Sequence, residues 1–264
     1  MEHFIITVTP QQLRALQGWS ATPAHLAYRI GRGPHLFRAG NSPAPRGGLM
    51  VVGDSGFDGL GGVSPFCQEV LRECQARGFS GAVLDFESRL PPLEQMASQL
   101  DDAFARRRWT LYVPEVYGLC APSARVMIPS ALSGGSLVQR LEEAQARFQN
   151  RVVLALQIAA EDFSLPSPAG SGVPLTQEEL EERTERLHPA VFFSRDLCAR
   201  YFTYMDQGGG AHFVLFDDGD TLRRKVEVAR QAGIDTFLIS WQEAENHTAQ
   251  LGLRRQGQSG RPGL

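Results

Sequence analysis

The stretch GFSGAVLDFE, residues 78–87, is the part of the sequence that decides the fold. Its first residue, Gly78, follows an amphipathic helical pattern over residues 66–77 and is typical of the end of a helix. The apolar residues that come next predict a buried strand, and this strand ends in charge. Because sites in parallel α/β folds form at the carboxyl ends of strands, Asp85 and Glu87 are candidate functional residues.

The same order of helix, glycine and apolar strand recurs along the chain. The segment GIDTFLISWQ, residues 233–242, echoes residues 78–87, because both follow a helix and end in polar residues around an aromatic one. Alternating strands and helices of this length predict a parallel sheet with helices outside. About seven or eight such units fit, so a single (β/α)8 TIM barrel is favoured over an open doubly wound sheet. We expect the barrel to span residues 1–245, followed by a polar C-terminal tail over residues 246–264.

Composition excludes several classes of partner. The formal net charge is -3, so there is no broad basic surface for nucleic acid. The four cysteines form no Cys-x-x-Cys pair and lie at no zinc spacing from a histidine, which predicts free thiols and no metal site. Because the sequence also has no dinucleotide fingerprint, we expect no cofactor. No apolar run is long enough for a signal peptide or a membrane span. We therefore expect a cytoplasmic protein without a membrane partner, with association to a spore or cell wall left open.

The pair Asp85 and Glu87 carries the chemistry that the residues themselves suggest. Residues two apart on a strand point the same way, about 6.6 Å apart, whereas Phe86 points toward the helix layer. Two carboxylates that face one barrel mouth repel each other, so one tends to hold a proton. A protonated Glu beside an ionised Asp suits general acid catalysis of glycosidic cleavage. The alternative, that both are only solvated strand-end charges, stays open at this point.

Two stretches resemble the family 18 glycoside hydrolases, the chitinase-like barrels. Residues 78–87 are similar to the fourth-strand signature of that family, Asp-Gly-hydrophobic-Asp-hydrophobic-Asp-aromatic-Glu. Residues 201–241, in which an aromatic-Asp-Asp stretch leads a helix and the last strand ends in Trp, resemble its spore-cortex and cell-wall branch. The resemblance implies retaining, substrate-assisted hydrolysis of β-linked N-acetylglucosamine polymers, such as peptidoglycan, spore cortex or chitin.

The resemblance also assigns roles to individual residues. Glu87 matches the general acid, and Asp85 matches the residue that orients the N-acetyl group of the substrate, which is itself the nucleophile. Trp241 matches the aromatic floor under the cleaved sugar. A tryptophan at a strand end also occurs as ordinary core packing.

The sequence departs from the family pattern at three positions. Ser80 and Val83 stand where the full signature has Asp, and Pro129 stands where the sixth strand of the family has a Tyr whose hydroxyl holds the N-acetyl carbonyl. The candidates to replace this hydroxyl are Tyr117, Glu115 and Gln157. These departures keep two alternatives open: a weakened barrel that binds glycans without cleaving them, and a barrel enzyme whose carboxylates hold a metal.

The glycine-rich stretch over residues 53–62 is a further candidate for the barrel mouth. It lacks the Lys-Ser/Thr of a phosphate-binding loop, so we interpret it as a loop that lines the cleft. Asp54 and Asp58 within it either bind sugar hydroxyls or are solvated, and we favour solvation.

Overall fold

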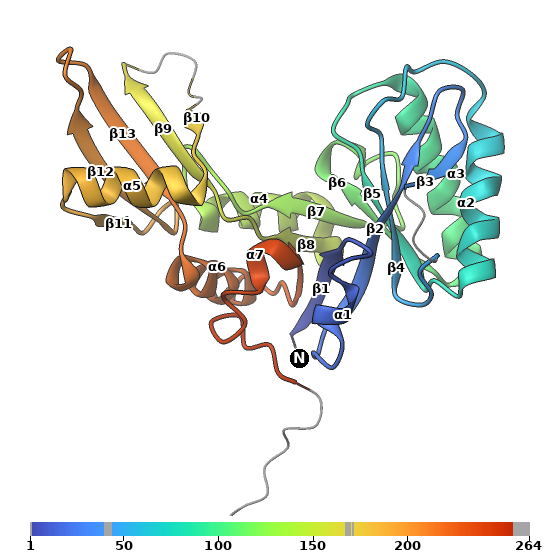
Figure 1. The fold of residues 1–264 in the computed structure, drawn as a ribbon. Coiled ribbons are helices and arrows are strands. Elements are labelled where there is room, and N and C mark those ends of the chain that lie inside the picture. The colour runs from blue at the N-terminus through green and yellow to red at the C-terminus, as the bar shows by residue number, and fades with distance from the viewer. Residues whose placement is uncertain (1, 40–43, 167–169, 171, 256–264) are drawn as a thin grey trace, which may run out of the picture.

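Eight parallel strands close into a barrel in the computed structural model, which describes residues 2–39, 44–166, 170 and 172–255 (Figure 1). The barrel strands are β1 (His3–Val8), β2 (Thr22–Ile30), β4 (Leu49–Gly53), β5 (Gly81–Asp85), β6 (Thr110–Pro114), β7 (Arg125–Pro129), β8 (Val152–Ala155) and β14 (Thr236–Ser240). Their order around the barrel is β1-β14-β8-β7-β6-β5-β4-β2, and pairing of β1 with β2 closes it. The predicted (β/α)8 barrel is confirmed.

Four long helices cover the outside of the barrel: α2 (Val63–Arg77), α3 (Pro91–Arg107), α4 (Leu137–Phe148) and α6 (Gly219–Gln231). Two short helices, α1 (Leu13–Leu16) and α7 (Trp241–Ala244), follow β1 and β14. The described part of the connection from β2 to β4 contains no helix and instead forms β3 (Leu36–Arg38), antiparallel to β2. Its sequence is rich in Gly and Pro, which disfavour helix. The connection from β6 to β7 contains only one 3-10 turn, η1 (Glu115–Tyr117).

Glycines fix the entry into β5. Gly78 ends α2 in the left-handed conformation with φ 68°, and its N–H bonds back to carbonyls of the last turn. At Gly81 an added Cβ would lie 2.1 Å from the carbonyl oxygen of Thr110 on the neighbouring β6. Only glycine therefore permits this close approach of β5 to β6 at the base of the barrel.

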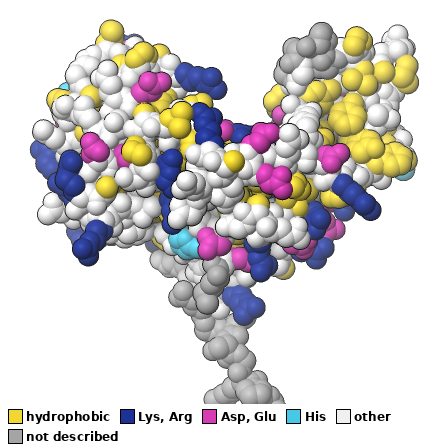
Figure 2. Space-filling model, turned by 180° about the vertical axis from the view of Figure 1, so that it is seen from behind, with side chains coloured by type: hydrophobic (Ala, Val, Ile, Leu, Met, Phe, Trp, Pro, Cys, Tyr) yellow, Lys and Arg dark blue, Asp and Glu magenta, His cyan; other side chains and the backbone are white. Residues whose placement is uncertain are grey.

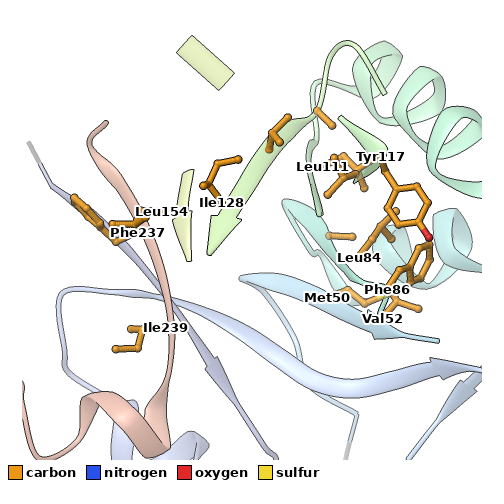
Figure 3. Packing of buried hydrophobic residues seen from close by; sticks show 14 of the residues in the cluster. Met50, Val52, Leu84, Phe86, Leu111, Tyr117, Ile128, Leu154, Phe237 and Ile239 are labelled. Carbon is orange, nitrogen blue, oxygen red and sulfur yellow. The ribbon is translucent and has the colours of Figure 1, made fainter. Parts of the chain in front are cut away.

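Alternation along the strands divides the core into two layers. One face of each strand fills the barrel interior with Ile5, Ala24, Leu49, Val51, Val83, Tyr112, Met127 and Val153. The other face packs under the helices, where Met50, Val52, Leu84, Phe86, Leu111, Ile128, Leu154, Phe237 and Ile239 belong to one large cluster (Figure 3). Because successive side chains of a strand point to opposite faces, the layer in which one residue lies shows which layer the next residue faces.

A subdomain is inserted between β8 and α6 and stands beside the barrel (Figure 1). Its five-stranded antiparallel sheet has the order β10 (Val173–Pro174), β9 (Ala160–Leu165), β13 (Ala211–Phe216), β12 (Ala199–Met205) and β11 (Phe192–Ser194). The helix α5 (Gln177–Leu187) packs on one face, and it opens with a capping box formed by Thr176 and Glu179. The segments 201–204 and 212–216 lie in β12 and β13, which pair as an antiparallel hairpin.

The face of this sheet opposite α5 carries a row of aromatic rings. The ring centroids of Phe192 and Tyr201 lie 5.6 Å apart, and those of Tyr201 and Phe213 lie 5.2 Å apart, both pairs stacked. Figure 2 views the molecule from behind and shows hydrophobic side chains gathered over this lobe. Phe192 is 53% exposed, so part of the row faces solvent.

A buried carboxylate joins the root of the subdomain to the barrel. The chain enters the subdomain at Ala159 and leaves it at Asp217, and these residues are bonded to each other through Asp217 N–H and Ala159 C=O at 2.8 Å. The Asp217 side chain also accepts hydrogen bonds from Lys225 Nζ at 2.7 Å and Thr221 Oγ1 at 2.9 Å. Because Asp217 and Lys225 are both buried, the pair fixes the place where the chain enters and leaves the subdomain.

The described part of the C-terminal segment, up to residue 255, packs on the barrel. Leu251 and Leu253 are buried, and Arg254 and Ser20 exchange hydrogen bonds of 2.8 and 3.0 Å. The predicted boundary between barrel and tail at residue 245 stays a prediction, and residues 256–264 lie outside the described part. Of the helices described, none combines the length and the apolar character needed to cross a membrane.

Candidate functional site

The carboxyl end of β5 directs Asp85 to the barrel mouth. Val83 lies in the interior layer, so Asp85, two residues later, lies on the same inner face. Leu84 and Phe86 are buried in the outer layer, as the alternation requires. Glu87 follows just beyond the strand and is exposed. The structure therefore places the two predicted carboxylates at one strand end, with the aromatic residue between them turned outward.

Electrostatics at this strand end favour the protonated form of Asp85. Its pKa is raised above the ordinary value of an aspartate, first because surrounding protein displaces water, and then because the negative charges of Glu87 and Asp54 repel its own. The side chain as a whole still has an exposed face, so it is open to a ligand. The repulsion expected between the two carboxylates is thus present, and it contributes to the raised pKa of Asp85.

Asp54, directly after β4, holds the turn that carries Glu87. Its side chain is only 5% exposed, and its two carboxylate oxygens accept the backbone N–H of Glu87 at 3.1 Å and of Ser88 at 2.9 Å. The interpretation of Asp54 as a solvated loop acid is therefore wrong. The signal was its place directly after a strand that neighbours β5, because carboxyl ends of parallel strands meet at one edge.

Tyr117 and Glu115 contact protein groups in this structure. The Tyr117 side chain is 1% exposed, its hydroxyl donates to the carbonyl of Ser88, and its ring meets that of Phe86 edge-on at 5.9 Å (Figure 3). Burial raises the pKa of Tyr117 to about 12. Glu115 forms ion pairs with Arg140 and Arg147 of α4. The proposed substrate contacts of both residues gain no support from this arrangement, because their polar atoms already have partners.

The ends of β7 and β8 line the mouth with uncharged groups. Met127 lies in the interior layer, so Pro129 follows on the inner face, and it is exposed. No side-chain hydroxyl is present at that position. Gln157 lies two residues beyond Ala155, on the inner face of β8, and its side chain is exposed. Its backbone N–H donates to the buried Ser130 hydroxyl at 3.1 Å, which ties the two strand ends together.

Trp241 points away from the mouth. Leu238 packs against the interior layer, whereas Phe237, Ile239 and Trp241 belong to the outer cluster. The Trp241 side chain is 5% exposed, and its ring centroid lies 6.2 Å from that of Trp19. In this arrangement the ring fills the space between the barrel and its outer segments and offers no open face to a sugar. The inner position at the end of β14 belongs to Ser240.

No group of three or more His, Cys, Asp or Glu side chains among the described residues is arranged to hold a metal ion. A scan of family models gives no match to the chain, and no curated protein matches it.

Solved structures do resemble the chain. The spore cortex-lytic enzyme SleL of Bacillus megaterium is 12% identical with a TM-score of 0.64, over 90% of this chain and 70% of that one. A chitinase of Chromobacterium violaceum is 15% identical with a TM-score of 0.67, over 99% and 100% of the two chains. A GH18 chitinase of Cycas revoluta, solved with (GlcNAc)3, is 12% identical with a TM-score of 0.58, over 94% and 97%. The fold of this chain is therefore the one that these chitinases and SleL share, as the sequence resemblance implied.

Proposed function

We propose that the protein is a glycoside hydrolase that acts on polymers of β-linked N-acetylglucosamine, such as peptidoglycan, spore cortex or chitin. The observation that carries this proposal is the Asp85–Glu87 pair at the mouth end of β5, in a barrel whose fold is shared with chitinases and a cortex-lytic enzyme. Carboxyl groups at the carboxyl ends of barrel strands are the usual position of catalytic groups in such folds.

In the proposed reaction Glu87 protonates the glycosidic oxygen as the bond to the leaving sugar breaks. The carbonyl oxygen of the substrate's own N-acetyl group attacks the anomeric carbon and forms an oxazolinium ion, which water then opens with retained configuration. Asp85 orients the N-acetyl group and stabilises the positive charge that develops on it. Its place on the inner face at the end of β5, two residues before Glu87, supports this division of roles.

The test is hydrolysis of fluorogenic chito-oligosaccharides and of purified peptidoglycan by the wild type and by Glu87→Gln. Loss of the general acid should lower turnover about 10²- to 10⁴-fold, while binding of the oligosaccharide persists. Glu245→Gln makes the same chemical change at an exposed residue beyond α7 and should leave turnover unchanged. Wild-type turnover in Glu87→Gln would overturn the assignment.

A second candidate function is glycan binding without cleavage. Pro129 favours it, because this residue occupies the mouth position at which the resemblance calls for a tyrosine hydroxyl. The same assay separates the two functions. Absence of product with the wild type, together with calorimetric binding of the oligosaccharide, would replace the first proposal by the second.

A further inference from the structure

Sheet pairing alone does not hold the turn that carries Glu87. On one side β5 pairs with β4 as far as Asp85, and on the other side its pairing with β6 ends at Val83. Glu87 and Ser88 lie beyond both ladders, and the next helix begins only at Pro91. The backbone N–H groups of this turn therefore need partners other than a strand.

Two buried side chains from the neighbouring strand ends supply hydrogen-bond partners for the backbone of this turn. Asp54, after β4, accepts both N–H groups of the turn, from Glu87 at 3.1 Å and from Ser88 at 2.9 Å. Tyr117, in η1 after β6, donates its hydroxyl to the carbonyl of Ser88. Because β4 and β6 flank β5 in the barrel, the turn is held from both sides.

Burial makes these bonds costly to lose. Asp54 is 5% exposed and Tyr117 is 1% exposed, so water has little access to replace either partner. The ring of Tyr117 also packs edge-on against Phe86, which fixes the residue before Glu87 as well. Three consecutive residues of the turn are thus restrained by the same two side chains.

We propose that Asp54 and Tyr117 are positioning residues that hold the backbone of Glu87 and Ser88, and thereby keep the Glu87 carboxyl where it protonates the glycosidic oxygen. The catalytic part of this inference rests on the proposed function. The geometric part does not, because it concerns only which side chains hold the turn. The two parts can therefore be tested separately.

Hydrogen exchange of the full chain tests the geometric part. Asp54→Ala should speed the exchange of the Glu87 and Ser88 amides strongly. Asp54→Asn should do so less, because one amide oxygen remains to accept. Asp58→Asn removes an exposed carboxylate from the same loop and should leave both amides unchanged. Wild-type protection of these amides in Asp54→Ala would overturn the inference.

Kinetics with chito-oligosaccharides test the catalytic part, with rates expressed per folded molecule. Asp54→Ala should lower kcat about tenfold or more and change KM by less than about threefold, because substrate contacts stay in place. Asp54→Asn should restore part of the rate, and Tyr117→Phe should lower kcat about threefold. A wild-type kcat in Asp54→Ala would overturn the positioning role. A wild type without turnover would instead overturn the proposed function, and the exchange result would still decide whether Asp54 and Tyr117 hold the turn.

Discussion

The ends of β5 and β14 have the same order of residues and serve different purposes. Residues 85–87 and 240–242 each come after a helix, a glycine and an apolar strand, and each places an aromatic residue between two polar ones. In both strands the aromatic residue, Phe86 or Trp241, packs in the outer layer. The position on the inner face belongs to the residue before it. An aromatic in this setting therefore packs under the helices rather than in the mouth.

The segment that follows each strand explains why, of these two strand ends, that of β5 carries exposed carboxylates and that of β14 does not. After β14 the chain turns directly into α7, and the Ser240 hydroxyl caps that helix by accepting the N–H of Glu243 at 3.2 Å. After β5 a free turn precedes α3, and a side chain from the neighbouring loop, Asp54, holds it. At the end of β14 the Ser240 hydroxyl is engaged in capping a helix. At the end of β5 a residue of another loop holds the turn, so the carboxylates of Asp85 and Glu87 remain available for chemistry.

The largest expected effect concerns Trp241. Because its ring is buried beside Trp19, Trp241→Ala should lower the free energy of unfolding by about 3–5 kcal/mol, measured by chemical denaturation. The value of KM, measured on the folded fraction, should not change. Trp241→Phe keeps an aromatic ring and should cost less. A variant with raised KM and wild-type stability would show that the ring faces the sugar, which would break the contrast between the two strand ends.

The next effect is a pH dependence located at the end of β5. The raised pKa of Asp85 means that the folded protein keeps a proton that the unfolded chain has already released. Stability from this group is present below the ordinary pKa of an aspartate and is lost as pH rises through the raised pKa. Asp85→Asn cannot ionise, so above that window it should melt about 1–3 °C higher than the wild type, a small gain because the side chain is partly solvated.

Thermal unfolding of both proteins between about pH 3 and about pH 8 measures this effect. The gain should vanish at the acid end, where Asp85 is protonated in both folded and unfolded chains. Asp58→Asn, in the exposed loop, should show no such dependence. A gain of equal size at every pH would mean that the cause is packing and not the charge of Asp85.

Much of the fold can be predicted from the sequence, because apolar alternation and glycine stops mark most of the barrel units. Alternation also placed Asp85 and Phe86 on opposite faces correctly. The similarity between residues 78–87 and 233–242 already indicated the outward position of Trp241. It aligns Trp241 with Phe86, which was expected to point toward the helix layer. The inserted sheet was harder to predict, because β9 reads AEDFSL and its polar residues bond within the subdomain, as Asp162 does with His212. The burial of Asp54 depends on a turn 33 residues away, so the order of the barrel strands indicates it and the residues around Asp54 alone do not.

The smallest expected effect concerns an uncharged contact to the sugar. We expect Gln157, just beyond β8, to make this contact and Ser240, at the end of the neighbouring β14, not to make it. Gln157 is exposed on the inner face, and Ser130 binds only its backbone. Among the described residues none forms a hydrogen bond with its side-chain amide, which can therefore meet a sugar hydroxyl. Gln157→Ala should raise KM for chito-oligosaccharides about two- to tenfold with little change in stability, as expected for one lost hydrogen bond.

Ser240→Ala should show the opposite pattern. It should lower the free energy of unfolding by about 1 kcal/mol, because the helix cap is lost, and leave KM unchanged. If Ser240→Ala raised KM instead, the end of β14 would contact the substrate after all, and helix capping would not explain why it carries no charge.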